Sequence, residues 1–221
     1  MYKIFLIIII SSLLSGVVFA QDKTSADYYQ LAMNSYDEAD FEAALKYLDQ
    51  SLAADSVSEK ALYLKAYILH DGDRLNDALS TYDRLLQINP VHEDGLYNRG
   101  LLKMTLNDFD GARADYDQSI ALNAQDPDLF MKRAYCRQLT ENLVGAIDDY
   151  SSAIQLDSTL LEAYASRGAG KITMILLKED EKPTFKRTKS ACEDLFIAQP
   201  LDDPIVKDLL SKYCPRKRKN K

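Results

Sequence analysis

Side chains that could perform acid–base, nucleophilic or metal chemistry are sparse in this chain. The two histidines, His70 and His92, do not have the spacing of metal ligands, and the chain has no glycine-rich phosphate loop and no serine nucleophile elbow. Residues 71–73 and 107–111 resemble fragments of calcium loops, but they lack the spaced acids and the closing Glu, which favours plain turns. The sequence therefore predicts a protein that is not an enzyme and that needs no cofactor or metal.

A 34-residue pattern covers most of the chain. In each repeat a small residue is followed nine residues later by a bulky apolar residue, then by an alanine, and finally by a branched aliphatic residue. A fixed period of about 20–50 residues is typical of solenoid proteins. The four sets are Ala32, Phe41, Ala44 and Leu52; Ala66, Leu75, Ala78 and Leu86; Gly100, Phe109, Ala112 and Ile120; and Ala134, Leu143, Ala146 and Ile154.

Each repeat has the pattern of two helices joined by a turn. In the third repeat the apolar residues fall at helical spacing in two runs, Leu96 to Met104 and Phe109 to Ile120, and neither run alternates as a strand would. Asn107 and Asp108 lie between the runs and are residues that favour helix N-caps. The small residues allow the paired helices to approach at the lower end of the roughly 8–10 Å range. We therefore expect an all-α fold.

This pattern resembles the tetratricopeptide repeat, a helix–turn–helix unit with Gly or Ala at its eighth position and Ala at its twentieth. Tyr82, Tyr116 and Tyr150 stand at the family's aromatic twenty-fourth position, and Pro90 stands at its closing proline. The resemblance implies a right-handed superhelical solenoid of about five repeats within residues 21–214. The expected repeats are 25–58, 59–92, 93–126, 127–160 and an irregular 161–203, followed by a capping helix at 204–214.

The resemblance also implies a concave groove, lined by positions two, five, nine and twelve of each first helix. Tyr and Met predominate there, which suits an extended or helical peptide with apolar side chains. The alternative is that these rings pack against the neighbouring repeat as core. The family's Lys and Asn clamp for a C-terminal carboxylate is absent, and Asn98 with Lys132 does not rebuild it. The candidate partner-binding residues are Tyr29, Met33, Tyr63, Tyr67, Tyr97, Met104, Met131 and Tyr135.

The fifth repeat is irregular. Asp180 stands where a small residue is expected, whereas Ala191 fits that position if about 11 residues are inserted around 179–187, a charged stretch with a proline. The insertion is either a longer first helix with a simple loop, or a loop that reaches into the groove or a partner. Beyond it, Asp203 and Pro204 predict the start of a final helix that covers the end of the stack. Its expected apolar stripe is Ile205, Val206, Leu209, Leu210 and Tyr213.

Arginine and aspartate recur sixteen residues apart, at positions seven and twenty-three. The pairs are Arg99 with Asp115 and Arg133 with Asp149. The inserted alignment of the fifth repeat then predicts that Arg167 meets Asp194. Such pairs bridge the two helices of a hairpin, and we expect partly exposed pairs worth about 0–1 kcal/mol each.

Residues 1–20 have the pattern of a secretory signal: Lys3, an apolar run from Ile4 to Leu14, and a small-residue cleavage site ending at Ala20. The sequence thus predicts an exported protein, periplasmic or secreted and most simply bacterial, with no membrane insertion after cleavage. The alternative is an uncleaved anchor, because the apolar stretch approaches the ~20 residues that span a bilayer.

The three cysteines allow one disulfide. Cys192 lies on the second helix of the fifth repeat and Cys214 at the end of the capping helix, so the two approach each other if those helices are antiparallel. Such a bond would contribute about 3 kcal/mol on the chain-entropy estimate. Cys136 falls among core positions, where a buried, inert thiol is common.

Charge limits the choice of partners. Residues 21–215 contain 21 of the Lys and Arg residues and all 34 Asp and Glu, a net charge near −13, and an acidic body repels nucleic acid. The basic tail, residues 215–221, has no apolar residue and is expected to be disordered. Two functions fit a protein or peptide partner. One is an adaptor or assembly scaffold that uses the groove; the other is an accessory subunit of an envelope complex that binds through its outer surface, loop or tail.

Overall fold

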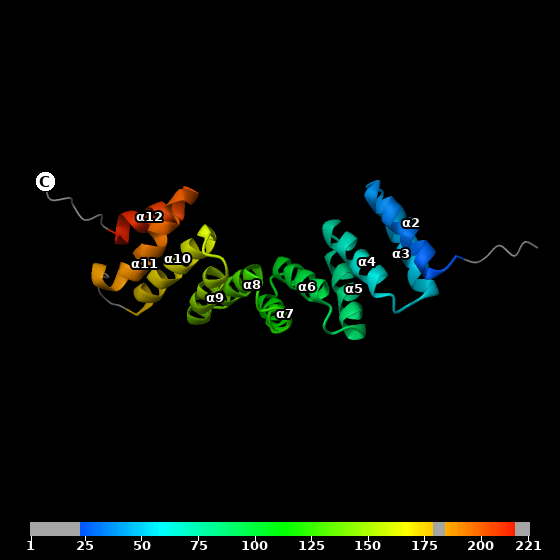
Figure 1. The fold of residues 1–221 in the computed structure, drawn as a ribbon, viewed down its shortest axis with the longest axis horizontal. Helices are drawn as coiled ribbons and strands as arrows, with labels where there is room; N and C mark the ends of the chain where they lie inside the picture. Colours follow the sequence, from blue (N-terminus) through cyan, green and yellow to red (C-terminus); the bar gives the residue numbers. More distant parts are fainter. Residues whose placement is uncertain (1–22, 179–183, 215–221) are drawn as a thin grey trace, which may run out of the picture. The chain divides into compact units, whose positions relative to one another are not determined.

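The computed structural model describes residues 23–178 and 184–214, and every regular element in these ranges is helical (Figure 1). The predicted signal segment at 1–20, the basic tail at 215–221 and part of the predicted insertion, residues 179–183, lie outside the described residues.

The helices follow one another as hairpin pairs, and the first helices of successive pairs begin 34 residues apart, from Ser25 to Leu161. This regular pairing confirms the prediction of an all-α helix–turn–helix repeat with an additional helix at the end. The pairs are α2 (Ser25–Asp37) with α3 (Phe41–Ala54), α4 (Glu59–Asp71) with α5 (Leu75–Ile88), α6 (Glu93–Thr105) with α7 (Phe109–Leu122), α8 (Pro127–Leu139) with α9 (Leu143–Leu156), and α10 (Leu161–Leu177) with α11 (Phe185–Ile197); a 3₁₀ turn, η1 (Gln199–Leu201), precedes α12 (Pro204–Tyr213).

The contacts divide the chain into two bodies, Met1–Ala61 and Leu62–Lys221. In the first body α2 packs on α3 through Ala32, Ala44 and Leu48, all buried. The Ser51 hydroxyl donates to the carbonyl oxygen of Ser25 at 2.8 Å and joins the two helices where they meet. The second body contains nearly all of α4 and the helices that follow it.

The small residues mark the closest helix approaches in the second body. A Cβ added at Gly100 would lie 2.9 Å from the ring of Tyr116, and one at Gly168 would lie 2.8 Å from Leu195 Cγ. Ala66 and Ala134, at the equivalent places, are also buried, and so are Ala112 and Ala146 at the small position of the second helices. The spacing that identified the repeat is therefore set by how closely the paired helices pack.

Each turn within the first four hairpins contains one residue in the left-handed region, again at a 34-residue interval. The φ values are 60° at Ala39, 58° at Asp73, 61° at Asn107 and 62° at Glu141. Backbone N–H groups at and after these residues bond the last carbonyls of the first helix, for example Asn142 N to Arg137 O at 2.8 Å. These are the bonds of a Schellman motif, which ends a helix by reversing the chain.

Polar side chains cap the N-termini of the second helices in several hairpins. Asp108 Oδ1 accepts from the backbone N–H of Gly111 at 2.9 Å, and Asn142 Oδ1 accepts from that of Gly145 at 3.1 Å. Asn107 and Asp108 therefore act as the turn and the N-cap that their types predict. Arg74 holds the cap position of α5 and makes no side-chain cap bond.

All three predicted arginine–aspartate pairs form. Arg99 Nη2 donates to Asp115 Oδ1 and Arg133 Nη2 to Asp149 Oδ1, each at 2.6 Å. Arg167 Nη2 donates to Asp194 Oδ1 at 2.6 Å, which confirms the alignment with the insertion. The expectation of partly exposed pairs is wrong, however, because all three aspartates are buried.

Each buried aspartate receives a second cation from the next turn of the first helix. Lys103 Nζ lies 2.9 Å from Asp115 Oδ2, Arg137 Nη1 lies 2.8 Å from Asp149 Oδ2, and Lys171 Nζ lies 2.7 Å from Asp194 Oδ2. Two cations compensate the charge of a carboxylate that has lost its hydration.

The same arginines reach back to the preceding hairpin. Arg99 Nη1 donates to Asp83 Oδ1 at 2.8 Å and Arg133 Nη1 to Asp117 Oδ1 at 2.7 Å. In the fifth repeat Arg167 Nη1 donates to Ser151 Oγ at 3.1 Å instead. These bonds connect adjacent hairpins of the second body.

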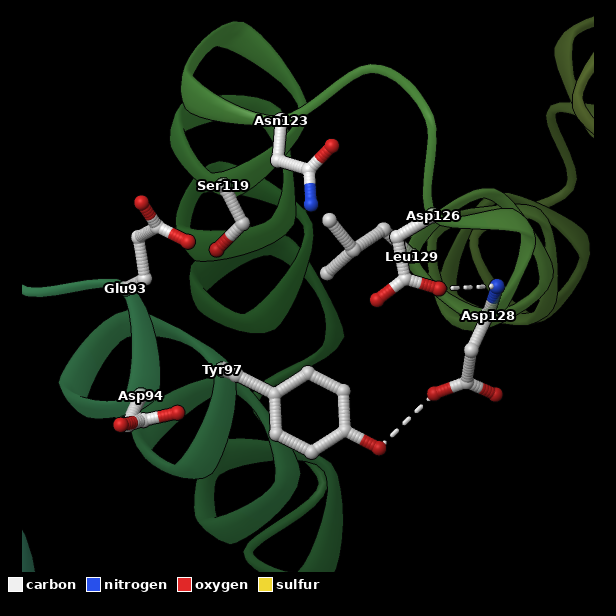
Figure 2. Close-up of a pocket in the computed structure, with 8 residues that line it drawn as sticks. All are labelled: Glu93, Asp94, Tyr97, Ser119, Asn123, Asp126, Asp128 and Leu129. Carbon is white, nitrogen blue, oxygen red and sulfur yellow. Dashed lines mark hydrogen bonds between the residues drawn. The ribbon is translucent and has the colours of Figure 1, made fainter.

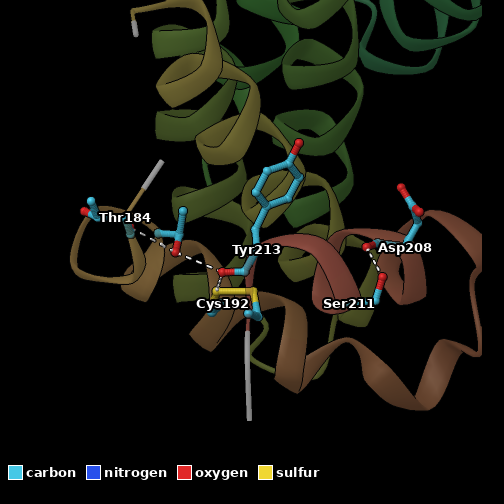
Figure 3. The surroundings of a disulfide bond; sticks show 7 residues. Thr184, Cys192, Asp208, Ser211 and Tyr213 are labelled. Carbon is cyan, nitrogen blue, oxygen red and sulfur yellow. Dashed lines mark hydrogen bonds between the residues drawn. A yellow bond between two sulfur atoms is a disulfide. The ribbon is translucent and has the colours of Figure 1, made fainter. Parts of the chain in front are cut away.

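The end of the second body is closed by α12, whose N-cap Asp203 accepts from the backbone N–H groups of Ile205 and Val206. Cys192 and Cys214 are joined by a disulfide, with their Cα atoms 5.5 Å apart, and Figure 3 shows this bond beside Tyr213. Val206 is buried as the stripe predicts, but Ile205 is 64% exposed and lines a surface hollow.

The fifth repeat begins with a longer helix than the others. α10 has 17 residues whereas α8 has 13, so the first helix is longer by about one turn and ends just before the predicted insertion at 179–187. The added turn carries Leu176 and Leu177 into solvent, and Leu177 is 74% exposed.

Candidate functional site

The eight candidate partner-binding residues all lie on the first helices of the hairpins, and none is fully buried. Tyr29 and Met33 are on α2 in the first body, and both are half-buried. The other six lie in the second body. We call these six the tyrosine–methionine face: Tyr63, Tyr67, Tyr97, Met104, Met131 and Tyr135.

Tyr63 belongs to an aromatic cluster between α4 and α6. Its ring stacks on His92 with centroids 5.5 Å apart, and it meets Tyr82 edge-on at 6.5 Å. Asn98 Nδ2 donates to the Tyr63 hydroxyl at 3.2 Å. His92 also caps α6, because its Nδ1 accepts from the backbone N–H of Gly95 at 3.0 Å. Tyr63 thus supports the packing of two repeats as well as the face.

Tyr97 makes the corresponding link to the next repeat. Its hydroxyl donates to Asp128 Oδ2 at 2.8 Å, which connects α6 to α8. Partial burial, followed by this bond to a carboxylate, raises the pKa of Tyr97. The phenol therefore remains protonated and acts as a donor.

An acidic hollow adjoins Tyr97 and is shown in Figure 2. It has a volume of about 270 Å³, and its lining includes the carboxylates of Glu93, Asp94, Asp126 and Asp128 together with the apolar side chain of Leu129. Lys132 Nζ lies 3.7 Å from Asp128 Oδ1 and offsets one of the four charges. The remaining field favours a positively charged group on a partner.

Met104 and Met131 contribute to the core. Met104 packs against the cluster of Ala112, Tyr116 and Cys136, and its Sδ accepts from the Tyr116 hydroxyl at 3.3 Å. Met131 packs against the cluster around Tyr150. For these two residues the core interpretation of the stripe describes the structure better than the groove interpretation.

The ninth position of the repeat is the most open part of the face. Tyr135 is 46% exposed and Tyr67 is 36% exposed. An exposed phenol ring offers a large apolar area with a polar tip, a combination common at binding sites.

Sequence reasoning overlooked several residues of this region. His92 and Asp126 are the N-caps of α6 and α8, and Asp128 lies in the first turn of α8, so their types indicate only the start of a helix. The signal that could have revealed them is the accumulation of acids around the starts of α6 and α8. Asn98 and Lys132, which do not rebuild the family's carboxylate clamp, are engaged with Tyr63 and Asp128 instead.

The remaining side chains that could take part in chemistry are possible metal ligands and the free thiol of Cys136. Among residues 23–178 and 184–214 no group of three or more His, Cys, Asp or Glu side chains is arranged to hold a metal ion. Burial raises the pKa of the Cys136 thiol to about 11, so the thiolate is a minor species at neutral pH. In the same ranges no helix is long and apolar enough to cross a membrane.

Paired helices that repeat every 34 residues around small residues define a helical-hairpin repeat protein, a class that generally binds other proteins and is generally not enzymatic. The tetratricopeptide repeat model matches residues 29–93 and 97–160, so this chain belongs to the tetratricopeptide repeat family and is a protein–protein interaction module.

Solved structures of the family have the same fold. The crystal structure of MamA superposes with a TM-score of 0.70 at 17% identity, covering 88% of this chain and 97% of that one. MamA from Desulfovibrio magneticus, residues 41 to the end, gives 0.69 at 17% identity over 80% and 94%. YrrB gives 0.72 at 17% identity over 85% and 92%. No curated protein matches the chain.

Proposed function

We propose that this protein is an exported adaptor or assembly scaffold that binds a peptide segment of another protein on its tyrosine–methionine face. The observation that carries the proposal is the exposure of Tyr67 and Tyr135 at the ninth position, next to half-buried Tyr63 and Tyr97. The family supports a partner that is a protein, and YrrB is described as a repeat protein with an unusual peptide-binding site. The proposed mechanism is binding alone, without a chemical step.

Export is supported by two features. Residues 1–20 have the pattern of a cleaved signal, and a disulfide joins Cys192 to Cys214, which is a bond typical of oxidising compartments. Cell fractionation followed by N-terminal sequencing tests this part, with Gln21 as the expected first residue. A mature protein that still begins at Met1 would support the anchored alternative.

The function is tested by pull-down with the chain from Gln21 to Lys221, which keeps every described residue. Substitution of Tyr63 and Tyr97 would also disturb packing between repeats, so the sharper variant is Tyr67→Ala with Tyr135→Ala. It is expected to weaken capture about tenfold or more, because exposed aromatic anchors dominate binding energies. Val144→Ala, at an apolar residue that is 60% exposed on α9, is the matched control. Equal capture by the double variant would refute the face as the site.

The second candidate is an accessory subunit of an envelope complex that binds through other surfaces. The exposed Leu176 and Leu177 at the end of α10 favour it. In the same pull-down, loss of capture by Leu176→Ser with Leu177→Ser, while the tyrosine variant still binds, would favour this candidate.

A further inference from the structure

The tyrosine–methionine face changes character in the fifth repeat. The fifth position is Tyr63, Tyr97 and Met131 in the second to fourth repeats and Ala165 in the fifth. The ninth position is Tyr67, Leu101, Tyr135 and then Ala169. Two large side chains are therefore missing from the same face at α10.

A hollow of about 270 Å³ lies where these side chains are missing. Its lining combines Ala165 and Ala169 of α10 with residues of η1 and α12. We call it the α10–α12 hollow; its apolar lining is Ala165, Ala169, Leu201, Ile205, Val206 and Leu209.

Some lining residues are packed into the core, whereas others are exposed to solvent. Val206 is buried, and Ala165, Leu201 and Leu209 pack against the core cluster that contains Leu195 and Cys192. Ile205 is 64% exposed although it lies on a helix that caps the stack. An apolar side chain that enters the hollow would shield Ile205 from water, and this burial is favourable by about 25 cal/mol per Å².

The size of the hollow indicates its occupant. Sites for small molecules and cofactors have volumes of about 300–1,000 Å³ and enclose most of the ligand. This hollow is smaller and open, so it suits one bulky side chain of a peptide rather than a cofactor.

The rim of the hollow is acidic. Its charged members are the carboxylates of Glu162 and Asp203, and its neutral polar members are Gln138 and Ser166, with no Lys or Arg in the lining. Gln138 belongs to α8, so the fourth repeat also contributes to the lining. A positive charge beside the entering side chain would complement this rim.

We propose that the α10–α12 hollow is an anchor pocket for a partner segment that carries a bulky aliphatic or aromatic side chain next to Lys or Arg. This inference rests on the proposed function and deepens it, because it names the side chains by which a partner is recognised at the C-terminal end of the face.

The test is a selection of random 12-residue peptides displayed on phage against the chain from Gln21 to Lys221, followed by anisotropy titration of the enriched peptides. The expected peptides share a bulky apolar residue adjacent to Lys or Arg. Ala169→Leu fills the hollow with a good helix former and is expected to weaken their binding about tenfold. Ala114→Leu, at an exposed alanine of α7, is the control and is expected to bind as the wild type does.

Two further variants keep the result interpretable. Ile205→Ser removes an exposed wall without touching the core and should also weaken binding. Glu162→Gln should weaken peptides with Lys or Arg about twofold to fivefold, but not those with the basic residue replaced by Gln. Circular dichroism melts show whether each variant is folded.

The outcomes separate the two proposals. Peptides that bind Ala169→Leu as tightly as wild type overturn the anchor pocket, and if Tyr67→Ala with Tyr135→Ala abolishes their binding, the proposed function stands. If neither variant weakens binding of the enriched peptides, or if the library yields no enriched peptide, both the anchor pocket and the proposed function are contradicted. If the enriched peptides contain no Lys or Arg beside the bulky residue, the proposal that the acidic rim recognises a positive charge is wrong.

Discussion

Three buried aspartates show how single residues organise the second body. Asp115, Asp149 and Asp194 each accept two bonds from one arginine and contact a second cation. A buried carboxylate with this many partners contributes little net stability compared with an apolar replacement, but removing one member leaves charges uncompensated. The groups are therefore better understood as determinants of geometry than as a general source of stability.

Removing one aspartate tests this interpretation. Asp149→Ala leaves Arg133 and Arg137 without their shared carboxylate and is expected to lower the free energy of unfolding by about 3–5 kcal/mol. Asp117→Ala removes the half-exposed partner of Arg133 and should cost at most about 1 kcal/mol. Urea denaturation of both variants provides the comparison, and equal midpoints would contradict the assigned role.

Tyr82 lacks the hydroxyl hydrogen bond that the equivalent tyrosines of the next two repeats make. The hydroxyls of Tyr116 and Tyr150 donate to the residue twelve positions earlier, to Met104 Sδ at 3.3 Å and to Gln138 Oε1 at 3.2 Å. In the second repeat that residue is His70, and the buried Tyr82 hydroxyl has no partner in the described residues. An unmade bond of this kind costs about 1–3 kcal/mol.

His70→Gln is expected to give the Tyr82 hydroxyl a hydrogen-bond partner and to change how the free energy of unfolding depends on pH. Burial lowers the pKa of His70 below 6.5, against the smaller opposite effect of Asp71. Because the folded state disfavours the imidazolium, the unfolded state binds more protons, and stability falls as the pH drops below about 6.5. The variant should gain about 1 kcal/mol at pH 7 and lose less than the wild type between pH 7 and pH 5.

Urea unfolding at the two pH values measures this difference. His92→Asn is the control, since asparagine can still cap α6 while His70 keeps its contribution to the pH dependence. A His70→Gln variant with the wild-type pH dependence would refute the assignment.

Among the elements, the turns carry strain that the helices do not. Glu141 adopts a φ of 62° between α8 and α9, a conformation that costs about 1–2 kcal/mol for residues with a Cβ, whereas Asn107 at the equivalent place tolerates it better. The turn nevertheless persists because its backbone bonds and the Asn142 cap determine it.

Glu141→Gly should therefore stabilise the hairpin of α8 and α9 by about 1 kcal/mol, since glycine adopts this conformation without penalty. Asn107→Gly is the matched variant and should gain less. Thermal melts of the two proteins decide the matter, and a loss of stability in Glu141→Gly would mean that its side chain has a role that the turn geometry does not reveal.

For the molecule as a whole, α12 depends on a covalent link. α12 packs on α10 and α11 through Val206, Leu209, Leu210 and Tyr213, and the disulfide ties its end to α11. Thr188 Oγ1 also donates to the carbonyl oxygen of Tyr213 at 3.1 Å. A short terminal helix with few neighbours is the part of a repeat protein most prone to local unfolding.

Cys192→Ser with Cys214→Ser should lower stability by about 3 kcal/mol on the chain-entropy estimate, with the loss concentrated in α12. Hydrogen exchange followed by mass spectrometry is expected to show faster exchange in α12 and little change in α6 and α7. Cys136→Ala, which keeps the disulfide, is the control. Uniform acceleration across all helices would contradict a local role.

Most of the repeat architecture was predictable from the sequence. The period of 34, the small residues and the spacing of Arg99 from Asp115 are properties of position along a helix, and helical position determines which side chains share a face. This reasoning extended across the insertion, where it correctly paired Arg167 with Asp194.

Tertiary structure alone decided what covers each face. The sequence placed Tyr63, Tyr97, Met104 and Met131 together with Tyr67 and Tyr135, but only the packing of adjacent repeats separates those that hold the repeats together from those left exposed. Packing likewise buried Asp115, left Ile205 in solvent and opened the α10–α12 hollow. The physical reason is that exposure and pairing depend on the neighbouring repeat, whose distance and orientation are not encoded in the spacing of a single helix.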